Sequence, residues 1–363
     1  MERVSKRGAK GGREGANADA SHPVIPAEAI ARPRGRAEPG TSRDRNDTPR
    51  GSGSRVSPRS GSPGMTTAAL PRRRPARGTR VAGAYKKTTI ALVYDFDGTL
   101  SPKPMQEYAF LPKLGVKAKD FWAECSRIAQ AERADPLITY MRLMYQKAKA
   151  KGLRIDRADL VAQGQHVELF PGVEEWFDAI AAYAEARGAG SGVTVKHYLV
   201  SSGLTEIIEG TRIAKHFARV FASEYWFDAY DLPFPKRVIT DTGKTQYLFR
   251  INKGREDYNE TINSHMPEDE RPIPFSNMIY FGDGETDVPS MALLKKNGGS
   301  AIAVHAPKGK PDKCVELFKA GRCDFYAGAD YREGSALWRR TCLLIDRIVA
   351  DVRVKEEGAG LVE

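Results

Sequence analysis

Several features that would direct a functional assignment are missing from this sequence of 363 residues. It contains no run of about 18 consecutive apolar residues, so we expect no transmembrane helix and no membrane contact. Its six histidines are dispersed, and its four cysteines form no CxxC pair, which argues against a zinc site and against a disulfide framework. We therefore expect free thiols and a cytoplasmic protein.

Two nucleotide-binding motifs are also incomplete. The stretch "DTGKT" resembles the end of a Walker A loop, but Val238 occupies the position of its first glycine. The stretch "GAGSG" follows a helical pattern and precedes a strand pattern, which reverses the order of a dinucleotide-binding motif. The basic N-terminus lacks the apolar stretch of a signal peptide. These stretches therefore predict neither a P-loop, nor a Rossmann dinucleotide site, nor a secretory leader.

Positive charge is concentrated near the N-terminus. Residues 1–89 carry 20 Lys and Arg against 7 Asp and Glu, whereas the rest of the chain carries 37 against 39. Residues 1–87 are also rich in Gly, Pro, Ser, Ala and Arg, so they cannot bury enough apolar surface to offset the entropy of ordering. We expect a disordered tail whose densest basic stretch, Pro71–Arg80, could contact phosphate backbones. The alternatives are a solubilising tail and a gene model whose true start is Met65.

From Thr88 onward, strand and helix patterns alternate. The run "TTIALVYD" is almost continuously β-branched and apolar, as in a strand that is covered on both faces. Residues 104–170 then place apolar residues at helical spacing. Such alternation predicts an α/β fold with a doubly wound parallel sheet. Further along, we expect a helix over 204–219, a short strand "VFAS" and a hairpin excursion over 224–245.

Three of the expected strands end in polar clusters: "DFDGT" at residues 95–99, "SSG" at 201–203 and "GDGETD" at 282–287. Because ligands of such sheets bind beyond the carboxyl ends of the strands, we expect these clusters to form one site. The carboxylates would repel one another, and a divalent cation would relieve the repulsion. Mg²⁺ prefers one or two carboxylates together with water and substrate phosphate. The clusters therefore predict a magnesium site that handles phosphate, and a carboxylate beside a metal and a lysine can become an aspartyl-phosphate.

The same residues resemble the motifs of a known enzyme family. "DFDGT", a serine after an apolar strand, an isolated lysine and "GDGETD" follow one another as in the haloacid dehalogenase (HAD) superfamily of phosphohydrolases. Their order and the helical insertion are similar to those of its phosphoserine phosphatase-like members. The resemblance covers about residues 88–330. It implies a HAD-like catalytic core (88–103 and 171–350) and a helical cap (104–170), flanked by the disordered basic tail (1–87) that the composition predicts and by a C-terminal tail (351–363).

The resemblance also implies a role for each matching residue. Asp95 would attack phosphorus, and Asp97 would protonate the leaving group and then activate water. Dehalogenases lack the second acid, because halide needs no proton, so Asp97 favours phosphoryl transfer. The implied enzyme is a Mg²⁺-dependent phosphomonoesterase acting on a small phosphorylated metabolite. The remaining implied residues are Ser201 and Lys244 on the phosphoryl group, Thr99, Ser202 and Gly203 around it, and Asp95, Asp97, Asp283 and Asp287 at the metal.

Alternatives stay open at this level. Ser202 could replace Ser201 as the phosphate-binding hydroxyl, and Lys253 could replace Lys244 as the cation. Asp287 could support either the metal or the lysine. The same scaffold also suits a phosphotransferase or a nucleotidase. Outside the enzymes, the alternative is a nucleic-acid-associated protein, and nucleic acid is expected to bind only through the basic tail.

Overall fold

The computed structural model describes residues 87–227 and 234–361. The expectations for the basic tail, including Pro71–Arg80 and the alternative start at Met65, fall outside the described residues. Within the described part, one sheet carries helices on both faces. Its strands are β1 (Thr89–Tyr94), β2 (Thr194–Leu204), β3 (Phe217–Trp226), β4 (Phe234–Arg237), β5 (Met278–Gly282), β6 (Ser300–His305) and β7 (Phe325–Gly328).

The described strands lie in the order β4-β3-β2-β1-β5-β6-β7, which places β1 in the middle of the sheet. Neighbouring strands pair in parallel, apart from β3 and β4, which pair antiparallel. Parallel neighbours need long crossover connections, and helices supply most of them. The predicted doubly wound parallel sheet and the hairpin excursion after β3 are therefore confirmed.

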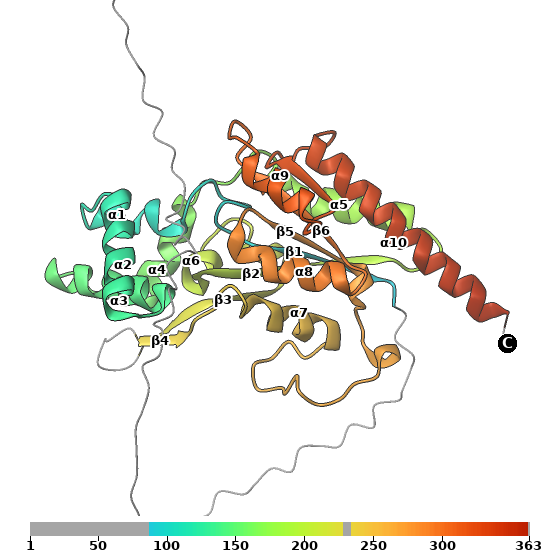
Figure 1. The fold of residues 1–363 in the computed structure, drawn as a ribbon, viewed down its shortest axis with the longest axis horizontal. Helices are drawn as coiled ribbons and strands as arrows, with labels where there is room; N and C mark the ends of the chain where they lie inside the picture. Colours follow the sequence, from blue (N-terminus) through green and yellow to red (C-terminus); the bar gives the residue numbers. More distant parts are fainter. Residues whose placement is uncertain (1–86, 228–233, 362–363) are drawn as a thin grey trace, which may run out of the picture. The chain divides into compact units, whose positions relative to one another are not determined.

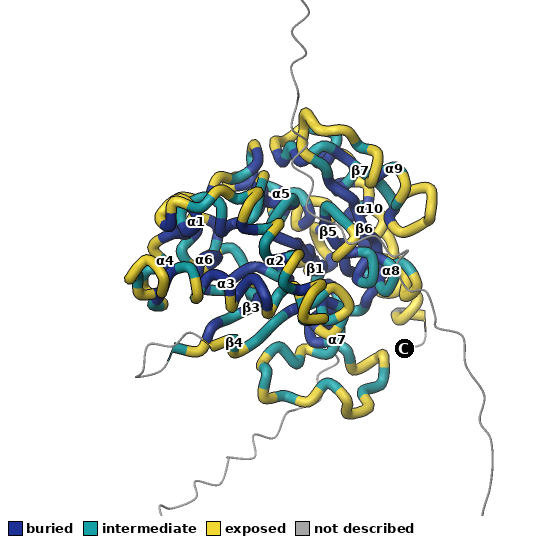
Figure 2. The backbone as a smooth tube through the Cα atoms, turned by 60° about the vertical axis from the view of Figure 1, so that its left-hand side comes forward, coloured by how far each residue is buried: buried dark blue, intermediate teal, exposed yellow. Residues whose placement is uncertain are grey.

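The central strand β1 contributes to two core layers. Ile90, Leu92 and Tyr94 pack into the layer that contains α5 (Val173–Arg187) and α10 (Ala336–Gly360). Ala91 and Val93 pack into the layer that contains α7 (Lys244–Lys253), α8 (Val288–Lys296) and α9 (Asp312–Lys319). Successive side chains of a strand point to opposite faces, so a strand that is covered twice must be apolar throughout. Figure 2 shows the backbone around β1 and β5 largely in the dark blue of buried residues.

Four α-helices lie between β1 and α5 in the chain, and Figure 1 shows them gathered at one side of the sheet. One of them illustrates how the sequence starts such a helix. Pro136 opens it, and the preceding Asp135 accepts the amides of Leu137 and Ile138 at 2.8 and 3.1 Å. The helices expected over 104–170 are present, while their assignment as a cap stays a prediction. They are α1 (Phe110–Lys113), α2 (Ala118–Glu132), α3 (Pro136–Ala150) and α4 (Arg157–Gln163).

Two segments differ from the sequence-based expectations. The helix expected over 204–219 is only α6 (Thr205–Glu209), and β3 begins before "VFAS" and ends after it. A Cβ atom on Gly210 would lie 1.7 Å from the Val161 carbonyl oxygen, so α6 ends where the chain packs tightly against α4. The C-terminal tail expected from residue 351 instead continues α10 to Gly360. None of the helices in the described ranges combines the length and apolar character needed to cross a bilayer.

Candidate active site

The first predicted cluster follows the central strand. Tyr94, the last residue of β1, pairs with Leu199 of β2 and with Phe281 of β5. The next residue, Asp95, is buried, and its amide donates to the Phe281 carbonyl at 2.9 Å. The carboxyl ends of β1, β2 and β5 therefore meet at one edge of the sheet, where parallel α/β sheets bind their ligands.

A buried ion-pair system lies at this edge. The Lys244 ammonium is 2.9 Å from Asp95 Oδ1 and 2.7 Å from Asp287 Oδ1. Lys244 is the first residue of α7, and only 1% of it is exposed. An ammonium buried this deeply requires carboxylate partners, because desolvation of an isolated charge is costly. The structure thus joins the loops after β1 and β5 through one lysine from α7.

Asp287 has hydrogen-bond donors on both of its oxygens. Oδ1 also accepts the Tyr280 hydroxyl at 2.7 Å. Oδ2 accepts the backbone amides of Asp283 at 3.1 Å and of Gly284 at 3.4 Å. A Cβ atom on Gly282 would lie 2.4 Å from this oxygen, so a glycine at the end of β5 lets Asp287 fold back against the strand. The glycines and aspartates of "GDGETD" therefore build one compact turn.

Asp283 packs against the loop that follows β1. Gly98 has a φ of +78°, and a Cβ atom there would lie 2.2 Å from Asp283 Oδ2. Both the left-handed conformation and the close approach require glycine at this position. One oxygen each of Asp95, Asp283 and Asp287 lies within 4.8 Å of the others, close enough together to hold a metal ion.

Asp97 belongs to a different set of contacts. Its Oδ1 accepts the backbone amide of Met105 at 2.9 Å. The Met105 sulfur accepts the amide of Leu204 at 3.2 Å, and a Cβ atom on Gly203 would lie 2.1 Å from the Met105 methyl group. Met105 therefore links Asp97 to the end of β2. The group of three carboxylates that could hold a metal does not include the Asp97 side chain.

The two serines of "SSG" have different partners. Ser201 is buried, and its Oγ accepts the amide of Gly203 at 3.0 Å. Ser202 Oγ donates instead to the Ile239 carbonyl at 2.8 Å, and the Ser202 carbonyl accepts the Tyr140 hydroxyl of α3 at 3.1 Å. Ser202 thus uses its hydroxyl proton to hold the chain ahead of α7, and Ser201 is the better placed of the two to donate elsewhere.

The two remaining candidates from the sequence are Thr99, in the loop after β1, and Lys253, at the end of α7. Thr99 is fully buried, its carbonyl accepts the Tyr331 hydroxyl at 2.8 Å, and its Oγ1 has no hydrogen-bond partner among the described residues. Lys253, the alternative lysine, donates to the carbonyls of Ile262 and Ser264 at 2.7 and 2.9 Å. The structure therefore places Lys244, and not Lys253, at the carboxylates.

Burial and mutual repulsion perturb the ionisation of the site. Desolvation, partly offset by Lys244, raises the pKa of Asp95 to about 6. Desolvation and the neighbouring Asp95 charge raise the pKa of Asp97 well above its ordinary value. Desolvation and the charges of Asp287 and Asp95 do the same to the pKa of Asp283. Burial alone would lower the pKa of Lys244, but its two carboxylate partners outweigh burial and raise it. One lysine does not balance these carboxylates, so their oxygen donors fit a divalent cation.

Sequence reasoning missed two residues of this cluster. Tyr280 is the one residue of the buried strand "MIYFG" with a hydroxyl group, and this polar tip in an otherwise apolar strand was an available signal. Met105 contributes its backbone amide, which every residue except proline has, and its sulfur, and nothing in the local sequence indicates that either group contacts this site. Contacts of this second kind become visible only in the folded chain.

Comparisons with known proteins identify a family and one similar protein sequence. A profile of the haloacid dehalogenase-like hydrolase family matches residues 92–292, more than half of the chain. An uncharacterized protein of Borreliella burgdorferi is 28% identical over 285 residues, which cover 70% of this chain and 95% of that protein.

Two solved structures are similar at low identity. A probable phosphoserine phosphatase from Vibrio cholerae is 16% identical over 74% of this chain and 68% of its own, with a TM-score of 0.47. A HAD family hydrolase from Salmonella enterica serovar Typhi is 17% identical over 66% of each chain, with a TM-score of 0.43. The family profile spans the loops of Asp95, Lys244 and Asp287, and it covers more than half of the chain. The chain therefore belongs to the haloacid dehalogenase-like hydrolase family.

Proposed function

We propose that this hydrolase is a Mg²⁺-dependent phosphatase that cleaves small phosphomonoesters through a phosphorylated Asp95. The observation that carries the proposal is the pair Asp95 and Asp97 at the end of β1, with the Lys244 ammonium 2.9 Å from Asp95. An alkoxide leaving group needs a proton donor, which a halide does not, and Asp97 supplies one. Family membership supports hydrolysis, and this second acid favours phosphate esters as the substrates.

Asp95 has the properties of the nucleophile. With a pKa of about 6, its carboxylate is ionised at neutral pH. The Lys244 ammonium and the hydrogen bond from the Asp95 amide to the Phe281 carbonyl of β5 hold it at the sheet edge. In the proposed first step, an Asp95 oxygen forms a bond to phosphorus while the bond from phosphorus to the leaving oxygen breaks. The product is an acyl phosphate on Asp95.

Asp97 has the properties of the acid and base. Burial and the neighbouring Asp95 charge raise the pKa of Asp97, which favours the protonated carboxyl group, and the Met105 amide donates to its Oδ1 at 2.9 Å. It donates this proton to the leaving oxygen in the first step. Its carboxylate then takes a proton from the water that attacks phosphorus, which releases phosphate and restores Asp95.

The other residues bind and orient the phosphoryl group. In this proposal Lys244 and the Ser201 hydroxyl bind its oxygens, and Thr99, Ser202 and Gly203 shape the loops around them; the Lys244–Asp95 contact and the hydrogen bonds of Ser201 and Ser202 support these roles. Asp95 and Asp283 are the side chains that would hold Mg²⁺, with the Asp97 backbone carbonyl as a third ligand implied by the family. When bound, the ion would neutralise charge that develops on the transferring group.

The helical insertion favours a small substrate. The Tyr140 hydroxyl of α3 donates to the Ser202 carbonyl, so the insertion contacts the carboxyl end of β2. We propose that α1–α4 act as a cap that limits the size of the leaving group and excludes water. The four cysteines are free and buried, which suits a reducing cytoplasm.

The first test is hydrolysis of p-nitrophenyl phosphate and a panel of metabolite phosphates, with Mg²⁺ and with EDTA. Turnover should require the metal and should disappear in Asp95→Asn. Asp346→Asn on α10 is the matched control, since this aspartate pairs with Arg187 away from the site, and it should retain activity. A folded wild-type protein without turnover on any of these esters would refute the proposal.

A further inference from the structure

We propose that Tyr280 is a positioning residue for Lys244 and acts through Asp287, the carboxylate that tethers this lysine. The inference rests on the proposed function, because it takes Lys244 to act on the phosphoryl group. It goes further by giving a role to Tyr280, a residue that lies outside every motif.

Lys244 and Tyr280 share one oxygen of Asp287. Asp287 Oδ1 accepts the Lys244 ammonium and the Tyr280 hydroxyl, each at 2.7 Å. Tyr280 and Asp287 are fully buried, and Lys244 is 1% exposed. Water cannot replace a lost donor easily at such a place, so each hydrogen bond to the carboxylate determines where the carboxylate lies.

The other Asp287 oxygen is also engaged. Oδ2 accepts the amides of Asp283 and Gly284 at 3.1 and 3.4 Å. An ionised carboxylate offers about four lone-pair positions in total. Four donors therefore occupy Asp287, which leaves it poorly suited to bind a cation. Asp283 differs, because its Oδ2 faces the loop at Gly98, beside the nucleophile Asp95.

Tyr280 supplies the rigid end of this arrangement. It lies in the middle of β5 and pairs with Val93 of β1 and Ala301 of β6, so its backbone cannot shift independently. A lysine has four rotatable side-chain bonds and loses considerable entropy when it is held in one position. The path from Tyr280 through Asp287 therefore aims the Lys244 ammonium at Asp95, and misplacement by about 1 Å can cost 100-fold in rate.

Tyr280→Phe removes only the hydroxyl, and Tyr198→Phe is the matched control. Tyr198 is a buried tyrosine on β2 whose hydroxyl also donates at 2.7 Å to a carboxylate, that of Glu256, away from the site. We expect Tyr280→Phe to lower kcat about 10- to 100-fold and to leave KM within about twofold of wild type. Tyr198→Phe should lose stability and keep its kcat. A kcat for Tyr280→Phe that matches the control would overturn the inference.

Metal binding provides a second readout. Calorimetric titration with Mn²⁺ should give the same dissociation constant for Tyr280→Phe and wild type, whereas Asp283→Asn should bind at least about tenfold more weakly. If Tyr280→Phe weakens Mn²⁺ binding and saturating metal restores its kcat, Asp287 acts on the metal and the inference is wrong.

A third readout needs no turnover. Tyr280 and Lys244 share Asp287 Oδ1, so Tyr280→Phe and Lys244→Met should shift the denaturation midpoint non-additively, whereas Tyr198→Phe and Lys244→Met should add. Lys244→Arg takes the place of Lys244→Met where the latter does not fold. Additive shifts for the Tyr280 pair would contradict the tether. A wild-type protein that lacks activity but shows the non-additive pair defeats the proposed phosphatase and leaves the tether standing.

Discussion

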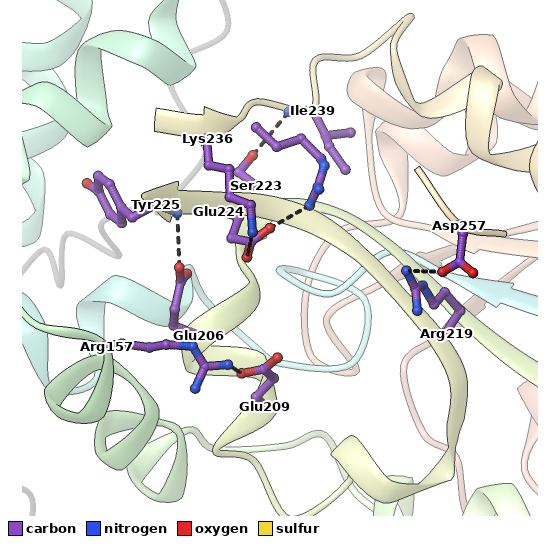
Figure 3. Close-up of polar contacts among 11 residues, drawn as sticks. Arg157, Glu206, Glu209, Arg219, Ser223, Glu224, Tyr225, Lys236, Ile239 and Asp257 are labelled. Atoms are coloured by element: carbon purple, nitrogen blue, oxygen red, sulfur yellow. Dashed lines mark hydrogen bonds and ion pairs between the residues drawn. The ribbon is translucent and has the colours of Figure 1, made fainter. Parts of the chain in front are cut away.

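Replacing Glu206 with glutamine should stabilise the folded chain at neutral and alkaline pH. Glu206 lies in α6 and is 1% exposed. Figure 3 shows its carboxylate directed at the backbone of β3, where Oε1 accepts the Tyr225 amide at 2.9 Å. Its Oε2 has no hydrogen-bond partner among the described residues. Glutamine keeps an acceptor for the amide and removes the buried charge, so it should relieve a cost that the wild-type chain carries.

The size and the sign of the effect follow from the perturbed pKa. Burial raises the pKa of Glu206 from an ordinary 4.5 to about 7. Below pH 4.5 both the folded and the unfolded chain hold the proton, so this group does not affect stability there. Between pH 4.5 and about pH 7 the unfolded chain loses this proton and the folded chain keeps it, so the free energy of unfolding falls as pH rises. The full loss, reached above about pH 7, corresponds to about 3 kcal/mol.

Urea unfolding of wild type and Glu206→Gln across this pH range measures the difference. The variant should be about 3 kcal/mol more stable at about pH 8 and no different at about pH 4. Glu209→Gln is the control, because Glu209 is an exposed neighbour that pairs with Arg157, and its removal should cost at most about 1 kcal/mol. Equal stability of Glu206→Gln and wild type at about pH 8 would refute the reasoning.

Three further outcomes are expected. Gly98→Ala should lower kcat/KM about 100-fold or more, because its Cβ would lie 2.2 Å from Asp283 Oδ2; unchanged kinetics would contradict this close approach. Burial lowers the pKa of His197 to about 4, so the folded chain should lose up to about 3 kcal/mol as pH falls from 6.5 towards that value. An NMR titration of His197 with its midpoint near 6.5 would exclude that effect. Lys253→Met should lower stability and leave kcat within about twofold, whereas Lys244→Met should abolish turnover; the opposite result would make Lys253 the catalytic cation.

The arrangement of the site could be predicted from the sequence because topology constrains it. Parallel strands place their carboxyl ends at one edge, so an apolar strand ending in "DFDGT" and another ending in "GDGETD" had to bring their aspartates together. The choice between Lys244 and Lys253 was also decidable. Lys244 shares one helical face with Tyr247, Leu248 and Ile251, which α7 buries, whereas Lys253 lies about two and a half turns from Lys244, on the other face.

Contacts between distant segments could not be predicted in this way. The end of α6 at Gly210 depends on the carbonyl of Val161 in α4, which a reading of local helical spacing does not include. The Asp97 carboxylate accepts the backbone amide of Met105 and does not belong to the group that the other three carboxylates form. Any residue except proline could donate such an amide, so the sequence does not indicate this contact. Such features are set by the packing of the helical insertion against the sheet.

The most direct test of the account is a search for the phosphorylated intermediate. The protein is mixed with p-nitrophenyl phosphate and Mg²⁺, quenched in acid and reduced with borohydride, and its peptides are then sequenced by mass spectrometry. Reduction of an aspartyl-phosphate gives homoserine, so the account predicts homoserine at position 95 in the wild type and none in Asp95→Asn. Turnover that leaves Asp95 unmodified, or that places the phosphate on another residue, would contradict it.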